Sequence, residues 1–187
     1  MKKLLIFLVV FLLLLGLGGA GALWYISPGQ NLDMAYQKVP LVDRAVDMAK
    51  RMSTELILTE GDINNIAKQA LSETPGYSGG IVVTGAKFQL AGERLIADLN
   101  IRYRDRIPAA LKLSYRLEWR SPDLVAVIEE AKLRDIPLST GYFGNVAIPI
   151  SRQLPGILTI RSVRIQNESL IVEFQKPTLE DLNGLLH

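Results

Sequence analysis

Apolar and polar side chains alternate without interruption over residues 111–120, LKLSYRLEWR, which predicts a β-strand with one apolar face. Side chains along a strand point to opposite faces in turn, so five apolar residues fall on one side and five polar residues on the other. The same period of two recurs along much of the chain. The strands predicted in this way are 81–90, 94–104, 111–120, 124–133, 158–166 and 169–175.

The alternation slips once, between Ile128 and Ala131, which predicts a β-bulge near Glu129 and Glu130. Because bulges bend strands, we expect a curved sheet. The turns between successive strands are short, and short connections favour antiparallel pairing over parallel crossovers. Residues 55–58 are also apolar and are expected to form a short strand or an extended lead-in.

Apolar residues at helical spacing predict two short helices before the sheet. Pro40 begins the first, since proline is favoured in the first helical turn. Thr59 begins the second, with Asp62 three residues on as in a capping box. A third helix is expected after Pro177. The predicted fold class is α+β, a curved antiparallel meander of about six strands packed with short helices. The apolar stripe of the first helix is Leu41, Ala45, Met48, Ala49 and Met52.

The N-terminal segment 4–26 carries no charged side chain and follows two lysines. A helix of this length crosses a bilayer, and the lysines favour a cytoplasmic N-terminus. Trp24 and Tyr25 suit the aromatic belt of a retained anchor, whereas residues 20–22 also have the A-x-A form of a signal-peptidase site. Either alternative exports the rest of the chain, as a single-pass protein of the cell membrane if the anchor is kept. The expected organisation is an anchor or signal peptide at 1–26, a linker at 27–39 and an extracytoplasmic α+β domain at 40–187.

Charge argues against a nucleic-acid partner. Apart from the two N-terminal lysines, 19 basic residues balance 19 acidic ones, whereas nucleic-acid-binding domains have a basic excess. Residues 87–120 are locally basic. Such a face suits contact with anionic headgroups, but a solvated sheet face with cross-strand ion pairs is the favoured interpretation.

The side chains that catalysis commonly uses are scarce. The chain has no cysteine, and its one histidine, His187, is the last residue. The usual nucleophile–base pairs are therefore missing, and no phosphate-binding loop or metal-binding motif is found. We expect a protein that is not an enzyme and that has no cofactor and no metal site.

Binding of apolar material is the sharper hypothesis. The predicted helices are short, so they could leave a groove between themselves and the curved sheet. The alternative is that the helices close the core completely. The aromatic pair in the loop at 140–146 is predicted as a lip of the groove, as a tip that touches the membrane, or as a cover for the sheet edge, and the cover is the favoured interpretation. The proposed lining is Leu95, Leu99, Leu111, Leu113, Tyr115, Leu117, Met48, Met52, Tyr142 and Phe143.

Three stretches carry a resemblance to a known family. These are LTEGDINNI at 58–66, the segment from Val127 that ends in AKLRDIPL at 131–138, and the closing hairpin at 163–174. On these the chain resembles the YpmS-like family of membrane-anchored proteins of Gram-positive bacteria. The resemblance implies an extracytoplasmic domain on one N-terminal anchor and implies no activity or site residue. The layout is more distantly similar to half of a tubular lipid-binding domain, although the helices here are shorter.

Two functions therefore follow as expectations. The first is a membrane-anchored, non-enzymatic domain that binds a lipid or another apolar component of the envelope. The second is a scaffold or interaction module without a ligand. It would hold an envelope protein through the loop at 140–146 or through the basic sheet face, represented by Arg102, Arg104, Arg116 and Arg120.

Overall fold

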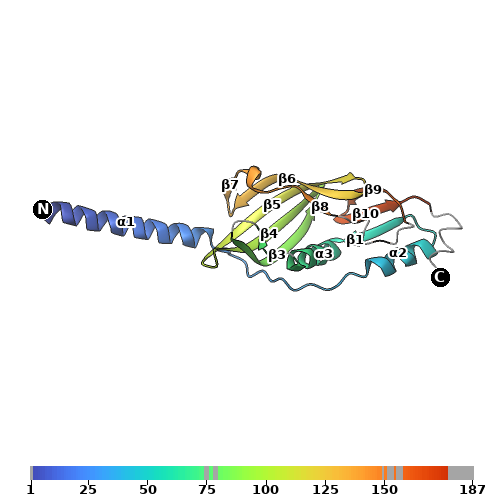
Figure 1. Ribbon diagram of the computed structural model, residues 1–187, viewed down its shortest axis with the longest axis horizontal. Helices are drawn as coiled ribbons and strands as arrows, with labels where there is room; N and C mark the ends of the chain where they lie inside the picture. The colour runs from blue at the N-terminus through green and yellow to red at the C-terminus, as the bar shows by residue number, and fades with distance from the viewer. Residues whose placement is uncertain are drawn as a thin grey trace.

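The computed structural model describes residues 2–73, 76–77, 80–148, 150, 154 and 158–176, with the backbone alone at 2–10 and 76–77. The chain begins with the long helix α1 (Lys2–Ile26), which projects from one end of an α+β body (Figure 1). The helix expected after Pro177 lies outside the described residues. The other helices are α2 (Leu41–Lys50), α3 (Glu60–Glu73) and the short 3-10 helix η1 (Thr140–Tyr142).

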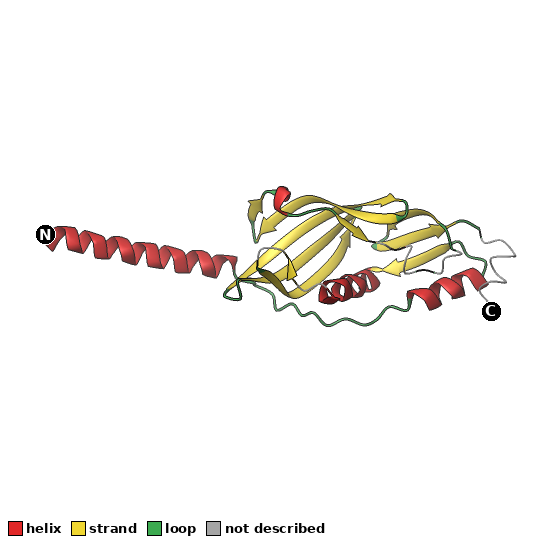
Figure 2. Cartoon of the chain, viewed as in Figure 1, coloured by secondary structure: helices red, strands yellow, loops and turns green. Residues whose placement is uncertain are grey.

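The larger of two sheets is the antiparallel meander that the sequence predicts, and it curves around α3 (Figure 2). Its bulge lies where the alternation slips, because Ser114 pairs with Glu130 and Tyr115 with Ile128, which leaves Glu129 as the extra residue. The strands follow the order β2 (Gly76–Tyr77), β3 (Ile81–Ala91), β4 (Arg94–Tyr103), β5 (Ile107–Arg120), β6 (Asp123–Leu133) and β7 (Ile136–Leu138), with β8 (Val146–Ile148) also paired to β6.

The last two predicted strands do not extend this meander. They pair instead with the apolar segment 55–58 in a second antiparallel sheet of order β1-β10-β9. The reason lies at β6, whose free edge is occupied by β7 near one end and β8 near the other, so the edge offers no place for β9. The strands of the second sheet are β1 (Glu55–Thr59), β9 (Ile160–Gln166) and β10 (Ser169–Phe174).

Both helices predicted before the sheet are present, and local chemistry sets where they begin. Pro40 is the N-cap of α2. At α3 the capping box forms in both directions, because Asp62 Oδ2 accepts from the Thr59 N–H at 2.9 Å and Thr59 Oγ1 accepts from the Asp62 N–H at 3.2 Å. Helix α2 ends at Lys50, and Met52 follows in a left-handed conformation with φ of 55°.

Helix α3 and the segment before α2 cover the edge of β3 beyond its short partner β2. Three alternate N–H groups of β3 donate to groups outside the sheet. Ala86 donates to the Asp33 carbonyl at 3.1 Å, and Phe88 and Leu90 donate at 2.9 Å to Asn64 Oδ1 and Glu60 Oε2. An open edge would leave these donors unpaired, so the covering segment completes the sheet without another strand.

The segment predicted as a linker is bound to the body along its course. Lys68 Nζ donates to Asp33 Oδ1 at 2.9 Å, and this hydrogen bond lowers the pKa of Asp33. Asn100 Nδ2 donates to the Gln30 carbonyl at 2.8 Å. A side chain at Gly85 would overlap the Leu32 carbonyl, so this position needs glycine. Residues 27–39 are thus part of the folded domain.

Helix α1 occupies the segment in which the sequence predicts an anchor or signal peptide. Its end is joined to the turn between β6 and β7, where Arg134 Nη1 donates to the Tyr25 carbonyl at 2.6 Å. Over the described residues, no helix is at once long and apolar enough to span a membrane. The membrane span stays a prediction.

Candidate functional site

A large cavity lies between the inner face of the large sheet, helix α3 and the small sheet. Its volume is about 1040 Å³. Ligand pockets have volumes of roughly 300–1,000 Å³, whereas ordinary protein interiors contain few voids larger than a water molecule. The cavity therefore has the size of a binding site and exceeds a packing defect by far.

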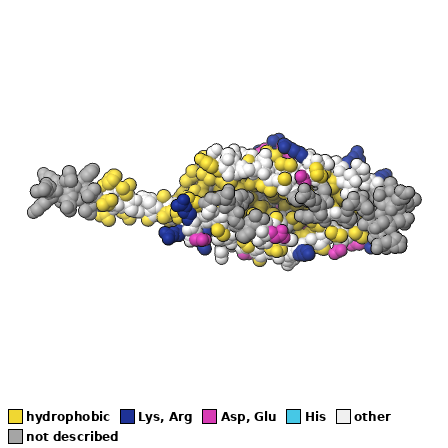
Figure 3. Space-filling model, in the orientation of Figure 1, with side chains coloured by type: hydrophobic (Ala, Val, Ile, Leu, Met, Phe, Trp, Pro, Cys, Tyr) yellow, Lys and Arg dark blue, Asp and Glu magenta, His cyan; other side chains and the backbone are white. Residues whose placement is uncertain are grey.

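The buried apolar residues form two clusters, and the cavity lies between them. One cluster belongs to the inner face of β3, β4, β5 and β6, and the other to α2, the small sheet and residues near it. Side chains from both clusters line the cavity. Figure 3 shows hydrophobic side chains gathered along a hollow in the middle of this face of the molecule. The apolar faces therefore converge on a space that they do not fill.

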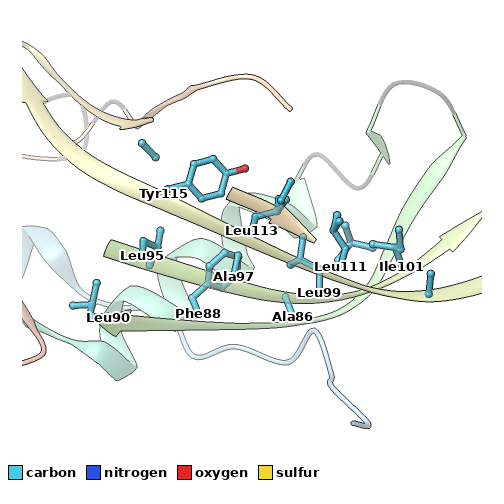
Figure 4. Packing of buried hydrophobic residues seen from close by; sticks show 14 residues of the cluster. Ala86, Phe88, Leu90, Leu95, Ala97, Leu99, Ile101, Leu111, Leu113 and Tyr115 are labelled. Carbon is cyan, nitrogen blue, oxygen red and sulfur yellow. The ribbon is translucent and has the colours of Figure 1, made fainter. Parts of the chain in front are cut away.

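The strands β3, β4 and β5 make the floor of the cavity. In Figure 4 the side chains of Phe88, Leu95, Ala97 and Tyr115 lie on one side of these strands, as the period of two requires. Leu113 is 1% exposed and belongs to the same wall. Of the predicted groove residues, those that line the cavity are Leu95, Leu99, Leu113, Tyr115 and Leu117.

The other predicted lining residues lie elsewhere. Leu111 is buried in the cluster of the large sheet but does not reach the cavity wall. Met48 is buried in the second cluster, and Met52 lies beyond the end of α2 with 72% of its surface exposed. The prediction was wrong for both methionines, because the helical stripe faces the small sheet and stops before Met52.

The loop aromatics do not form a lip of the cavity. Tyr142 is 84% exposed, and Phe143 packs against the cluster of the large sheet. Neither residue lines the cavity. The alternative prediction, an aromatic side chain folded over the sheet, therefore holds for Phe143.

The sequence did not identify the residues that cover the floor. Helix α3 contributes Ile63, Ile66 and Ala67, which are partly buried side chains at helical spacing. The small sheet contributes side chains that are brought to this place only by the pairing of β1 with β10. Their alternation along β1 and β10 was the available signal. The cavity residues from the small sheet are Leu56, Leu58, Leu170 and Val172.

Polar residues at the cavity belong mostly to its solvent side. Lys38, Asp43 and Glu73 are exposed, and Gln69 donates a hydrogen bond to Glu73 Oε1 at 3.1 Å within α3. The walls beyond them are aliphatic or aromatic. A ligand held here would bury an apolar body and keep its polar part near this rim.

A buried carboxylate holds α2 and α3 together beside the cavity. Asp62 Oδ2 accepts from Arg44 Nη1 at 2.7 Å and from Thr59 Oγ1 at 2.9 Å. Burial raises the pKa of Asp62, but the bonds from Arg44 and Thr59 outweigh burial and leave this pKa below its ordinary value. The ionised carboxylate therefore stabilises the arrangement of the two helices.

The outer face of the large sheet is charged, and several of its charges are paired across strands. Lys112 Nζ lies 3.3 Å from Asp98 Oδ1. Glu129, the bulge residue, accepts from Arg94 Nε at 2.8 Å and lies 3.1 Å from Arg116 Nε. These pairs confirm the prediction of a solvated face with cross-strand ion pairs.

The comparisons with known proteins assign no family. No family model matches the chain, and neither a curated protein nor a solved structure matches it significantly. The resemblance to the YpmS-like family stays a prediction.

Proposed function

We propose that this protein is a membrane-anchored, extracytoplasmic and non-enzymatic domain that binds a lipid or another apolar envelope component. The observation that carries the proposal is the cavity of about 1040 Å³ between the large sheet, α3 and the small sheet. Helix α1 would be the anchor, and the remaining chain would present the cavity outside the membrane.

The chemistry of the walls favours an apolar ligand. Water in such a cavity would find few hydrogen-bonding partners, because the side chains of the floor are hydrocarbon or aromatic. Each methylene group moved from water to such surroundings gains about 0.8 kcal/mol. An acyl chain therefore gains more free energy from the cavity than a polar molecule of equal size.

The rival function, an interaction or scaffold module, has weaker support. It was based partly on the arginines of the outer sheet face. Of the four arginines, Arg116 and Arg120 already pair with Glu118, at 3.3 and 2.6 Å, so only Arg102 and Arg104 are left without an ion pair among the described residues. A module that only holds a partner also needs no large apolar cavity.

The test is native mass spectrometry with lipid extraction on the full chain, released from its cells in a mild detergent. We expect a stoichiometric added mass that extracts as a lipid. Ala67→Trp places an indole ring in the cavity from α3. It should lower the affinity for the lipid about tenfold, which corresponds to roughly 1.4 kcal/mol, and so lower the fraction of the chain that carries the added mass.

The matched control is Ser72→Trp on the same helix, where the side chain is exposed and does not line the cavity. Lipids that merely surround α1 would be retained equally by both variants, so only the difference between them reports on the cavity. A chain without added mass, or equal loss in both variants, would contradict the proposal.

A further inference from the structure

Two turns of the large sheet and the end of α1 meet at one end of the body. The N–H of Arg104, in the turn between β4 and β5, donates to the Gly80 carbonyl at 2.7 Å. The N–H of Arg134, in the turn between β6 and β7, donates to the Ala110 carbonyl at 2.8 Å. Figure 1 shows α1 leaving the body at this end. Whatever surrounds the end of α1 therefore also meets these turns.

Side-chain contacts fix the end of α1 to the second turn. Arg134 Nη1 donates to the carbonyls of Tyr25 and Ser27, at 2.6 and 3.3 Å, and its guanidinium lies 5.3 Å from the centre of the Tyr25 ring. The Tyr25 hydroxyl donates to Asp135 Oδ2 at 3.1 Å. Ile26 packs against the core cluster of the large sheet. These contacts join the end of α1 to the turn between β6 and β7.

This end carries exposed arginines that are not neutralised by ion pairs. Arg102, Arg104 and Arg106 are exposed, and none of them forms an ion pair with another residue that the structure describes. The arginines of the outer face differ, since Arg94 and Arg116 both pair with Glu129. Repulsion among close cations lowers stability unless an anion compensates it.

The surroundings of these arginines suit a lipid–water interface. Trp24 is 80% exposed near the end of α1, and Tyr103 is 38% exposed with the Arg104 guanidinium 5.3 Å from its ring centre. Tryptophan and tyrosine are enriched at the headgroup level of membranes. Arg102 also lines a recess of about 500 Å³ between residues 28–32 and the strands β3, β4 and β5.

We infer that this end of the body docks on anionic phospholipid headgroups, with Arg102, Arg104, Arg106 and Arg134 facing the membrane surface. The inference rests on the proposed placement of α1 in a membrane. Basic clusters beside a membrane helix are attracted by anionic headgroups. These arginines lie far beyond the roughly 15–20 residues after a membrane helix that govern its orientation, so they do not conflict with export of the body.

The docking surface would determine how the body stands on the membrane. With α1 and both turns held at the headgroups, the long body extends away from the bilayer, as its direction from α1 in Figure 1 indicates. The small sheet would then be far from the membrane. Anionic lipids would limit tilting of the body about the end of α1.

The experiment uses the absence of cysteine from the chain. Ile136→Cys puts a single thiol beside the turn at 134–135, on a strand position that is 45% exposed. Ser121→Cys is the matched control, at the far end of the 14-residue strand β5. Each full-length variant is labelled with a fluorophore and reconstituted into vesicles that contain lipids with nitroxide-labelled headgroups. The vesicles are made of phosphatidylcholine alone or with one quarter phosphatidylglycerol.

We expect quenching at position 136 to increase several-fold when phosphatidylglycerol is present, and to fall again in high salt. Quenching at position 121 should stay low in both membranes. The triple variant Arg102→Gln, Arg104→Gln and Arg106→Gln should lose the dependence on phosphatidylglycerol. The triple variant Arg94→Gln, Arg116→Gln and Arg120→Gln removes equal charge from the outer face. This control should keep the dependence of quenching on phosphatidylglycerol.

The contrary outcomes separate the two proposals. If the full chain does not float with either kind of vesicle, α1 is not a membrane anchor and the docking surface is overturned with it. If the chain floats but quenching at position 136 is independent of phosphatidylglycerol, or equally dependent in both triple variants, only the docking surface is overturned. The result for the cavity, measured by lipid extraction, is unaffected by this second outcome.

Discussion

The two faces of the large sheet are built from the same strands and meet different needs. On β5, Leu113 points inward and is 1% exposed, while its neighbour Lys112 points outward and pairs with Asp98 on β4. The outer face neutralises its charges within itself and with water. The inner face needs a cover, which α3 and the small sheet supply in part, leaving the cavity of about 1040 Å³.

This difference indicates where to look for function. A face of paired surface charges tolerates change, because each exposed pair contributes about 0–1 kcal/mol. An apolar face that remains partly uncovered has a free energy to gain from an additional molecule. The candidate site therefore belongs to the inner face, and substitutions on the two faces should differ strongly in effect.

The largest effect is expected for Leu113→Asp on the inner face. A carboxylate there has no partner among the surrounding hydrocarbon, so we expect the full chain to lose at least about 3 kcal/mol of stability, together with any bound lipid. Thermal unfolding in detergent measures the loss. Lys112→Ala, the neighbouring residue on the outer face, should cost less than about 1 kcal/mol. An unchanged unfolding temperature for Leu113→Asp would mean that water reaches this wall of the cavity and solvates the carboxylate.

An intermediate effect is expected for Asp62→Asn, which weakens the connection between the covering helices. We expect a loss of about 1–2 kcal/mol at neutral pH, because the variant keeps a capping group but loses the ion pair with Arg44. Asp47→Asn, an exposed position of α2, should change stability by less than about 0.5 kcal/mol.

The same variant gives a prediction for pH. The pKa of Asp62 is lowered in the folded state, so its stabilisation is complete above the ordinary aspartate value of about 3.9 and is lost as the pH falls through the lower folded value. Unfolding measured from pH 7 to pH 2 should therefore show the wild type and Asp62→Asn converging in acid. A difference that stays constant to pH 2 would argue against the ionised pair.

The smallest effect is expected for Glu129→Gln on the outer face. It removes the ion pairs with Arg94 and Arg116, both of which are mainly exposed, so the loss should be below about 1 kcal/mol. Salt should reduce the difference from the wild type, because screening weakens surface pairs. A loss as large as that for Leu113→Asp would remove the distinction between the two faces.

Local patterns predicted the parts of this fold that depend on neighbours in sequence. Alternation located the strands of the meander, and its slip located the bulge at Glu129. The spacing of Thr59 and Asp62 predicted the capping box. Inner positions such as Leu95 and Leu113 were assigned to the groove because period two fixes their common face.

Predictions that depended on distant contacts were less accurate. The stripe through Met48 and Met52 continued past the end of α2, because spacing alone does not show where a helix stops. The period of two places Asn100 on the outer face, yet it is buried, because residues 28–32 cross that face and the Gln30 carbonyl accepts a hydrogen bond from its amide. Neither the end of α2 nor the hydrogen bond between Asn100 and Gln30 can be read from the periodicity of the sequence.

The sequence by itself determined which residues of each strand share a face and where the apolar first helix lies, since these follow from backbone periodicity and hydrophobicity. Only the tertiary structure decided that β1 pairs with β10, because an edge strand pairs with whichever free edge the packed chain brings close. The cavity follows from that choice. Its size depends on how far α3 and the small sheet stand from the large one, a distance set by contacts between segments remote in sequence.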